Sequence, residues 1–417
     1  MKVEIIAIGD ELTSGRILNT TSSFAARQLY EAGYEIYAMH TIGDTPTLIG
    51  DALKKAISQV DAVIVTGGLG STDDDLTNEA VSMALNRPTL PNLEILSTVR
   101  THLDEITSTP VGQLEKLAWL PEGAEALSPK SRMAGYQLIH DGKPIFFLPG
   151  IPSQMKQLLS EHVLPRLATW HKDHYLTTYQ RVFKIFNLPE VEVNRRISTL
   201  DLSRAALIGY YPVFPEVHLS LIIRDKQNRS AEKLFKSSCK AINTVLGDAI
   251  YGYDRDCMES VAGALLLRAN WQLAVAESCS GGLISQKLTS IPGSSAYFLG
   301  GVVSYANDLK INFLGVPEDL LREKGAVSRE VAEAMATGIK TRTGADIGLS
   351  VTGIAGPTGG SPEKPVGTVY IGIATLEGTW ATRFQFGGDR QQIREMTALS
   401  GLDLIRKYLL QTADSKE

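Results

Sequence analysis

The chain has 417 residues, 43% of them hydrophobic and 21% charged, which is an ordinary globular composition but more chain than one hydrophobic core holds. A formal net charge of −5 without any Lys/Arg-rich block argues against a nucleic-acid partner. The three cysteines lack the spacing of a zinc site or a disulfide framework, and no apolar run has the length of a signal peptide or a membrane span. We therefore expect a cytoplasmic protein of two or three domains.

The first 170 residues alternate short apolar runs with helical patterns. The apolar runs predict strands at 3–8, 34–42, 62–66 and 144–148. The helical patterns lie at 22–32, at 47–59, after Asp75 and at 153–170. This rhythm predicts an α/β domain over 1–170 with a doubly wound, mostly parallel sheet, and ligands are expected at the carboxyl ends of its strands.

Two further domains are expected along the rest of the chain. Residues 171–253 read as strand, helix, strand, helix and short strand, which predicts a small α+β domain with an antiparallel sheet. Residues 254–417 read as a second α/β domain, with strands at 272–276, 300–304, 347–351 and 368–374. In this domain Ser328 can cap a helix, Asn307 or Asp308 can cap another, and a final helix starts near Arg390.

Acidic and glycine-rich clusters follow three of the N-terminal strands. The strand-end rule brings Asp10, Asp44 and the segment 67–75 to one rim of the sheet. Carboxylates there suit Mg²⁺ or Mn²⁺ bound with a phosphate, which backbone N–H groups of a glycine-rich loop can also approach. The candidate residues at this phosphate site are Gly67, Gly68, Gly70, Thr72 and Asp10. Alternatively, Asp10 and Asp75 cap helices and the other carboxylates lie in solvated turns.

The last third of the chain carries hydroxyl-rich stretches but no histidine after His218. A nucleophile there must be activated without imidazole, which leaves a lysine, a tyrosine or a metal to assist one of three candidates, Ser278, Ser280 and Cys279. A serine with a lysine base is the first choice: Lys310 in a water-poor site could accept the proton of Ser278, with Tyr305 relaying it. Alternatively, Tyr305 is a packed strand residue, Lys310 a solvated helix residue, and Cys279 a buried packing residue.

Several nearby positions are candidate substrate contacts. Donors in the turn before a helix can hold a phosphate or an oxyanion, and a guanidinium can bind a 5′-phosphate. The candidates on this ground are Gly281, Gly282, Gly293, Ser294, Ser295 and Arg390. Ordinary turns, and a surface ion pair of Arg390 with Asp389, are the alternatives.

Two sets of motifs in this chain resemble the two ends of the CinA family. The segments Gly9–Glu11, Gly43–Asp44, Gly67–Gly70 with Asp74–Asp75, and Leu148–Pro152 resemble its molybdopterin-binding-like first domain. The segments Ala276–Gly282, Ser304–Lys310 and Val351–Pro357 resemble its nicotinamide-mononucleotide deamidase domain. Both sets occur in the family's order and span essentially the whole chain.

For the last domain, the resemblance implies hydrolysis of the carboxamide of nicotinamide mononucleotide to nicotinate mononucleotide and ammonia, without a cofactor. Ser278, Tyr305 and Lys310 would form the catalytic group and Ser278 the acyl-enzyme. Thr352 would lie at the amide or the oxyanion, with the backbone of Gly353 near the nucleotide.

For the first domain, the resemblance implies a metal-dependent ADP-ribose pyrophosphatase. Asp44, Asp74 and Asp75 would hold a divalent metal such as Mg²⁺ at the phosphates. The two activities would serve pyridine-nucleotide recycling, in a homodimer. The chain departs from the family's pattern at Ser71, at Gln154 and over 129–136. These departures leave a second hypothesis open, in which the first domain binds a pterin or nucleotide without turnover and the last is an assembly or regulatory partner.

Overall fold

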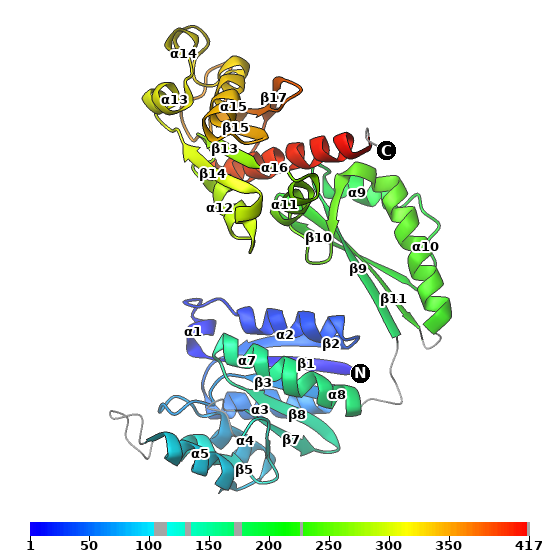
Figure 1. Ribbon diagram of the computed structural model, residues 1–417. Helices are drawn as coiled ribbons and strands as arrows, with labels where there is room; N and C mark the ends of the chain where they lie inside the picture. Colours follow the sequence, from blue (N-terminus) through cyan, green and yellow to red (C-terminus); the bar gives the residue numbers. More distant parts are fainter. Residues whose placement is uncertain (104–114, 130–134, 171–176, 226–227, 415–417) are drawn as a thin grey trace. The chain divides into compact units, whose positions relative to one another are not determined.

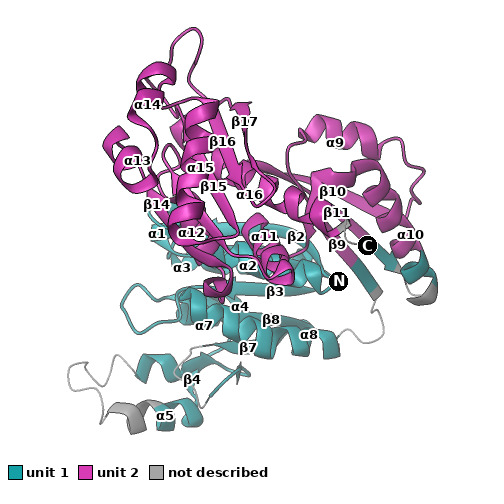
Figure 2. Cartoon of the chain, turned by 45° about the horizontal axis from the view of Figure 1, so that its top comes forward, with its two compact units in different colours: residues 1–179, 223–233 teal, residues 180–222, 234–417 magenta. Residues whose placement is uncertain are grey.

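The computed structural model describes residues 1–103, 115–129, 135–170, 177–225 and 228–414. The chain divides into two compact units, one of residues 1–179 and 223–233 and the other of residues 180–222 and 234–417 (Figure 2). Within the described residues, no helix combines the length and apolar character that a membrane span requires. Of the departing segment 129–136, residues 130–134 lie outside the described part of the chain.

A six-stranded sheet forms the centre of the first domain (Figure 1). Its strands, in spatial order, are β2 (Glu35–Ile42), β1 (Lys2–Ile8), β3 (Ala62–Thr66), β8 (Lys143–Leu148), β7 (Tyr136–His140) and β6 (Glu125–Ala126). The first four are parallel, and β7 and β6 join antiparallel at one edge. The predicted mostly parallel sheet is confirmed, and β6 and β7 are strands that the apolar pattern did not indicate.

Helices cover both faces of this sheet, which is why all five residues of β3 are buried. One face packs against α2 (Thr20–Glu31), α7 (Pro152–Leu158) and α8 (Leu164–Trp170). The other packs against α3 (Pro46–Gln59) and α4 (Thr77–Leu85). The helix expected at 153–170 contains a π-helical turn between α7 and α8. Elements that were not expected are α1 (Asp10–Thr13), α5 (Leu93–Leu103), β4 (Thr89–Pro91) and β5 (Trp119–Pro121).

The middle segment has the expected α+β composition, and most of it belongs to the second compact unit. Its four strands are ordered β10 (Ala206–Val213), β11 (Glu216–Asp225), β9 (Thr177–Ile185) and β12 (Ile250–Tyr253), and its helices are α9 (Glu190–Ile197) and α10 (Asn228–Leu246). β12 pairs antiparallel with β9. β10 was not predicted, because it is an edge strand with no buried alternate face and contains Gly209 and Pro212, which interrupt a strand pattern.

The last domain is built on a five-stranded sheet ordered β14 (Phe298–Val303), β13 (Leu273–Glu277), β15 (Ile347–Gly353), β16 (Thr368–Ala374) and β17 (Thr379–Gln385). β13 is parallel to both β14 and β15, so the three strands end at the same edge. β16 and β17 then continue antiparallel, and β17 was not expected. The α/β fold class predicted for this domain is confirmed.

Two helical layers enclose this sheet (Figure 1). One layer consists of α11 (Met258–Ala269), α12 (Leu283–Thr289) and α16 (Arg390–Asp414), the other of α13 (Asn307–Leu314), α14 (Glu318–Lys324) and α15 (Arg329–Thr343). Ser328 caps α15 as predicted, its hydroxyl accepting from the N–H of Val331. The cap predicted at Asn307 or Asp308 is wrong: α13 starts after Ala306 and has no side-chain cap.

Helices α13 and α15 approach each other closely at Gly338. A Cβ added there would lie 1.9 Å from the carbonyl oxygen of Leu314, which is backbone and cannot rotate away. We expect Gly338→Ala to lower the free energy of unfolding by about 1–3 kcal/mol, because α13 must shift to admit the methyl group. Calorimetric melting of the full chain measures the change.

The exposed neighbour Thr337 in the same helix supplies the control for this substitution. Thr337→Ala should change stability by no more than about 0.5 kcal/mol. Equal melting temperatures for Gly338→Ala and the wild type would show that the two helices do not depend on this contact.

Candidate functional site

A cavity of about 200 Å³ lies at the carboxyl edge of the last domain's sheet. Ser278 directly follows β13, Tyr305 is the second residue after β14 and Thr352 is the next-to-last residue of β15, so the parallel strands bring three distant segments to one place. The predicted residues that line the cavity are Ser278, Tyr305, Lys310, Thr352, Gly353 and Arg390. Since a 150 Å³ engineered cavity holds a benzene ring, this one has room for a single six-membered ring, with the rest of a ligand outside.

A tight turn at 278–282 presents Ser278 to the cavity. The Ser278 N–H donates to the carbonyl of Val351, which ties the turn to β15. Gly281 and Gly282 have φ of 62° and 92°, left-handed values that residues with a Cβ avoid. The two glycines therefore let the chain reverse directly into α12, and this is the role their geometry supports.

Glu277 holds this turn in place, a role that the sequence reasoning missed. The side chain is fully buried, and its two carboxylate oxygens accept four hydrogen bonds of 2.6–3.1 Å. The donors are the Ser280 and Ser285 hydroxyls and the N–H groups of Ile284 and Ser285. A buried carboxylate is tolerated only when hydrogen bonds satisfy its oxygens in this way. A glutamate at the end of an otherwise apolar strand could therefore have indicated from the sequence that such partners lie nearby.

Lys310 contacts the hydroxyl of Ser278 from α13. Its side chain is only 1% exposed, and Nζ lies 3.2 Å from Ser278 Oγ, 2.7 Å from the Ser304 carbonyl oxygen and 3.2 Å from that of Tyr305. Burial lowers the pKa of the Lys310 amine because the charged form loses its water. The predicted pairing of serine and lysine is therefore present in the geometry.

Tyr305 lies at the rim of the cavity and not between Ser278 and Lys310. Its ring is 61% exposed, and its hydroxyl accepts a hydrogen bond of 3.1 Å from Arg390 Nη2. Arg390 is held in turn by a 2.7 Å bond from Nη1 to the carbonyl of Gly356. In the described chain the phenol makes no hydrogen bond to Ser278 or Lys310, so this placement suits contact with a substrate better than a proton relay.

The other two nucleophile candidates are less suited to the role. Ser280 donates its hydroxyl proton to Glu277 at 2.7 Å. Burial raises the pKa of the Cys279 thiol to about 12, so it carries almost no thiolate at neutral pH. Among the three candidates, Ser278 alone hydrogen-bonds to Lys310 within the described residues.

The remaining predicted contacts divide into two groups. Thr352 is 1% exposed and donates its hydroxyl proton to the Ala326 carbonyl at 2.7 Å, while Gly353 lines the cavity beside it. Gly293, Ser294 and Ser295, by contrast, precede β14 and so lie at the amino edge of the sheet. The structure does not bring this last turn to the cavity.

In the first domain, Asp10 and Asp44 form the centre of the predicted acidic rim. Each carboxylate accepts from the other residue's backbone N–H, at 2.8 and 3.2 Å, which joins the ends of β1 and β2. Burial raises the pKa of Asp44, and the neighbouring charges of Asp10 and Asp74 add to this effect. Neither Asp10 nor Asp75 caps a helix, because α1 and α4 begin after Gly9 and Leu76 without a side-chain cap, so the capping alternative is wrong.

The glycine-rich loop after β3 lies at the same edge of the sheet. Gly67 and Gly68 have φ of 102° and 64°, and a Cβ on Gly67 would meet the carbonyl of Ile8 at 2.2 Å. Thr72 closes the loop by donating its N–H and hydroxyl to Asp75 at 3.0 and 2.6 Å, and a Cβ on Gly70 would strike this same carboxylate. Lys116, which the sequence reasoning missed, donates to the Thr72 carbonyl at 3.0 Å.

These carboxylates do not form a prearranged metal cage. The described residues contain no group of three or more Asp, Glu, His or Cys side chains placed to hold a metal ion, and Asp75 is directed to Thr72. Mg²⁺ commonly binds through one or two carboxylates with substrate phosphates and water completing its shell. Asp44 and Asp74, which are close enough to interact electrostatically, fit a metal that arrives with a phosphate.

Three sequence families match the chain in succession. A probable molybdopterin binding domain matches residues 4–169, the damage-inducible protein CinA KH domain matches 180–252, and the CinA C-terminal domain matches 255–409.

Full-length relatives extend the similarity over nearly the whole chain. A CinA-like protein of Desulfotalea psychrophila is 69% identical, covering 99% of this chain and 100% of its own, and one of Geotalea daltonii is 38% identical, covering 98% and 99%. Among solved structures, the competence/damage inducible protein CihA from Agrobacterium tumefaciens is 40% identical, with 36% of this chain and 93% of that chain covered and a TM-score of 0.34. On the identity and coverage of the full-length relatives, the chain belongs to the CinA family.

Proposed function

We propose that the last domain hydrolyses the carboxamide of nicotinamide mononucleotide to nicotinate mononucleotide and ammonia, with Ser278 as the nucleophile. One observation carries the proposal: the buried amine of Lys310 lies 3.2 Å from Ser278 Oγ in a cavity without histidine. The cavity has room for one pyridine ring, which matches the reacting end of this nucleotide. The resemblance of the domain's sequence motifs to the deamidase domain of the CinA family is the reason for choosing this nucleotide over other amide substrates.

The two carbonyl oxygens around Lys310 explain how it acts as a base. A neutral amine has two N–H bonds and one lone pair. When the N–H bonds point to the carbonyls of Ser304 and Tyr305, the lone pair is left for the hydroxyl proton of Ser278. Lowering of the lysine pKa by burial raises the fraction of amine in this state at neutral pH.

The reaction then follows from this geometry. Ser278 Oγ bonds to the amide carbon while its proton passes to Lys310, which gives a tetrahedral intermediate and an ammonium. The ammonium returns the proton to the amide nitrogen, the C–N bond breaks and ammonia leaves. Water then attacks the acyl-enzyme, Lys310 accepts one of its two protons, and the serine ester bond breaks to release the carboxylic acid, which gives its proton to the released ammonia. The serine alkoxide takes the proton back.

Thr352 and Arg390 position the substrate in this proposal. Because the Thr352 hydroxyl donates to Ala326, its oxygen is left as an acceptor, which suits the NH₂ of the carboxamide and not a negatively charged oxyanion. Arg390 lies at the exposed rim beside Tyr305, where the 5′-phosphate of a nucleotide would meet water. The ring would thus enter the cavity with the phosphate outside it.

The first domain, in the same proposal, binds the diphosphate of ADP-ribose with a divalent metal and cleaves it. Asp44 and Asp74 would hold the metal, which would neutralise the phosphates and polarise the phosphorus centre. The glycine loop at 67–70 would offer its backbone to the phosphate oxygens. The engagement of Asp75 with Thr72 is the one specific observation that favours binding without turnover as the second candidate.

Replacing the nucleophile tests the deamidase proposal directly. With nicotinamide mononucleotide as substrate, Ser278→Ala should reduce ammonia release by at least about a thousandfold, because the variant lacks the hydroxyl that would form the acyl-enzyme. Cys279→Ala, on the adjacent residue, should retain most of the activity. An inactive cysteine variant beside an active serine variant would make the thiol the nucleophile.

If Lys310 is the base, deamidase activity should increase with pH. Since neutral Lys310 is the active form and burial lowers its pKa below 10.5, activity should rise with pH through a single ionisation below that value. Lys310→Arg should be nearly inactive across the range because a guanidinium stays protonated. Measured kcat/KM against pH for both proteins, with Lys340→Arg on a neighbouring helix as the control, tests this expectation. Near-normal turnover by Lys310→Arg at pH 7 would overturn the assignment.

Chelation should separate the two proposed activities. We expect EDTA treatment followed by dialysis to abolish ADP-ribose cleavage, because the diphosphate would then face unneutralised carboxylates. Asp44→Asn should lower cleavage by at least about 100-fold, because it removes a proposed metal ligand. Ammonia release from nicotinamide mononucleotide should be unchanged in both experiments. Cleavage that persists after EDTA would refute the metal requirement, whereas no cleavage with Mg²⁺ or Mn²⁺ would select the binding-only function.

A further inference from the structure

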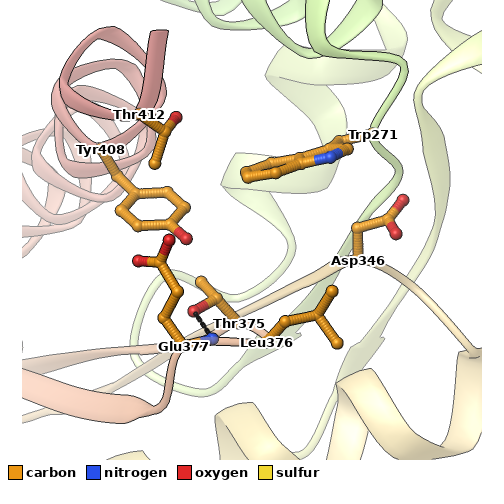
Figure 3. Close-up of a pocket in the computed structure, with 7 residues that line it drawn as sticks. All are labelled: Trp271, Asp346, Thr375, Leu376, Glu377, Tyr408 and Thr412. Carbon is orange, nitrogen blue, oxygen red and sulfur yellow. Dashed lines mark hydrogen bonds between the residues drawn. The ribbon is translucent and has the colours of Figure 1, made fainter. Parts of the chain in front are cut away.

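A second cavity, of about 180 Å³, lies at the opposite edge of the last domain's sheet (Figure 3). Trp271 and Asp346 precede β13 and β15, whereas Ser278 and Thr352 stand at or beyond the other ends of the same strands. Five residues of β13 at roughly 3.3 Å each put the two cavities about 16 Å apart. The second cavity is therefore separate from the proposed amidase site.

Aromatic rings form one wall of this cavity. Trp271 and Tyr408 are stacked with their ring centroids 5.9 Å apart, and Trp380 supports Tyr408 from another direction at 5.5 Å. Tyr408 and Thr412 are one turn apart on α16, so the helix presents both to the cavity, as Figure 3 shows. The faces of Trp and Tyr rings carry negative potential and attract cations.

Two carboxylates complete the lining. Glu377 belongs to the turn between β16 and β17, where its N–H donates to the hydroxyl of Thr375, and its side chain is exposed beside Tyr408 (Figure 3). Asp346 holds the N–H of Gln272 with one oxygen at 2.7 Å. None of the ion pairs between described residues includes either carboxylate. The cavity thus has two negative charges and no lysine, arginine or histidine in its lining.

The charge of Glu377 reaches the aromatic wall. Burial raises the pKa of the Tyr408 hydroxyl, a hydrogen bond with Thr375 lowers it, and the negative charge of Glu377 raises it further. The carboxylate therefore lies close to the Tyr408 hydroxyl, at the edge of the aromatic wall. Leu376, on the same turn, also lines the cavity and exposes 86% of its surface.

We propose that this cavity binds a small organic cation with an alkylated ammonium head. Such a head has an apolar surface that suits Leu376 and the aromatic rings, and a positive charge that suits both the rings and the two carboxylates. A small head group of this kind has room in 180 Å³, since a cavity of 150 Å³ holds benzene. A neutral ligand of the same shape would gain only the apolar contacts.

Choline and its uncharged carbon analogue, 3,3-dimethylbutan-1-ol, test the charge requirement with matched shapes. Ligand-observed nuclear magnetic resonance follows the methyl signal of each as the full chain is added. We expect the choline signal to broaden and that of the alcohol to change much less. Equal broadening of the two, or no effect on choline, would overturn the proposal.

Two variants at exposed positions locate the binding without disturbing the core. Glu377→Gln removes one charge and should weaken choline binding about fivefold, and Leu376→Arg places a competing guanidinium at the mouth and should abolish it. Glu318→Gln, an exposed carboxylate on α14, is the matched control and should bind as the wild type does. Choline binding that is unchanged in both cavity variants would place the ligand elsewhere and refute the site. The outcome is independent of whether Ser278 is an amidase nucleophile.

Discussion

The burial of one lysine amine governs the architecture of the last domain. An ammonium group that is 1% exposed is costly unless acceptors replace its lost water, and Lys310 finds three, all within 3.2 Å. Two of them are carbonyls at the end of β14 and the third is the hydroxyl of Ser278 at the end of β13. The lysine therefore holds two strand ends together, and the same burial that requires these contacts also lowers its pKa.

A second buried charge complements the first. Glu277, immediately before the candidate nucleophile, accepts two N–H groups and the Ser285 hydroxyl from the start of α12, and the Ser280 hydroxyl from the turn between. Negative charge at a helix N-terminus is favourable because the helix dipole and the free N–H groups both point toward it. Ser278 is thus positioned from both sides, by the acidic residue before it and the helix after it. These contacts fix the position of the candidate nucleophile although Gly281 and Gly282 follow it in the turn.

The first domain uses a different device at the corresponding edge of its sheet. Asp10 and Asp44 each accept the other's backbone N–H, which leaves two carboxylates close together where β1 and β2 end. Burial raises the pKa of Asp44 and the neighbouring negative charges raise it further, so a cation or a phosphate-bound metal would relieve the repulsion. In the proposed function, this site would take a ligand that brings its own positive charge, whereas the last domain would supply its own base, Lys310.

The amino-acid sequence alone was sufficient for the fold class, because the alternation of apolar runs and amphipathic helices is a local pattern that burial on both faces of a sheet requires. The absence of histidine after His218, together with the resemblance to the CinA family, also predicted the pairing of Ser278 with Lys310. The sequence did not indicate β10 or β17, whose side chains are largely exposed and so lack a buried periodicity. Tertiary contacts decided the direction of individual side chains: the Tyr305 hydroxyl accepts a hydrogen bond from Arg390, and the Asp75 carboxylate accepts from Thr72. They also decided the position of the turn at Gly293, which lies at the edge of the sheet opposite the cavity. Hydrogen-bond partners far apart in the chain determine such orientations, and no local pattern records them.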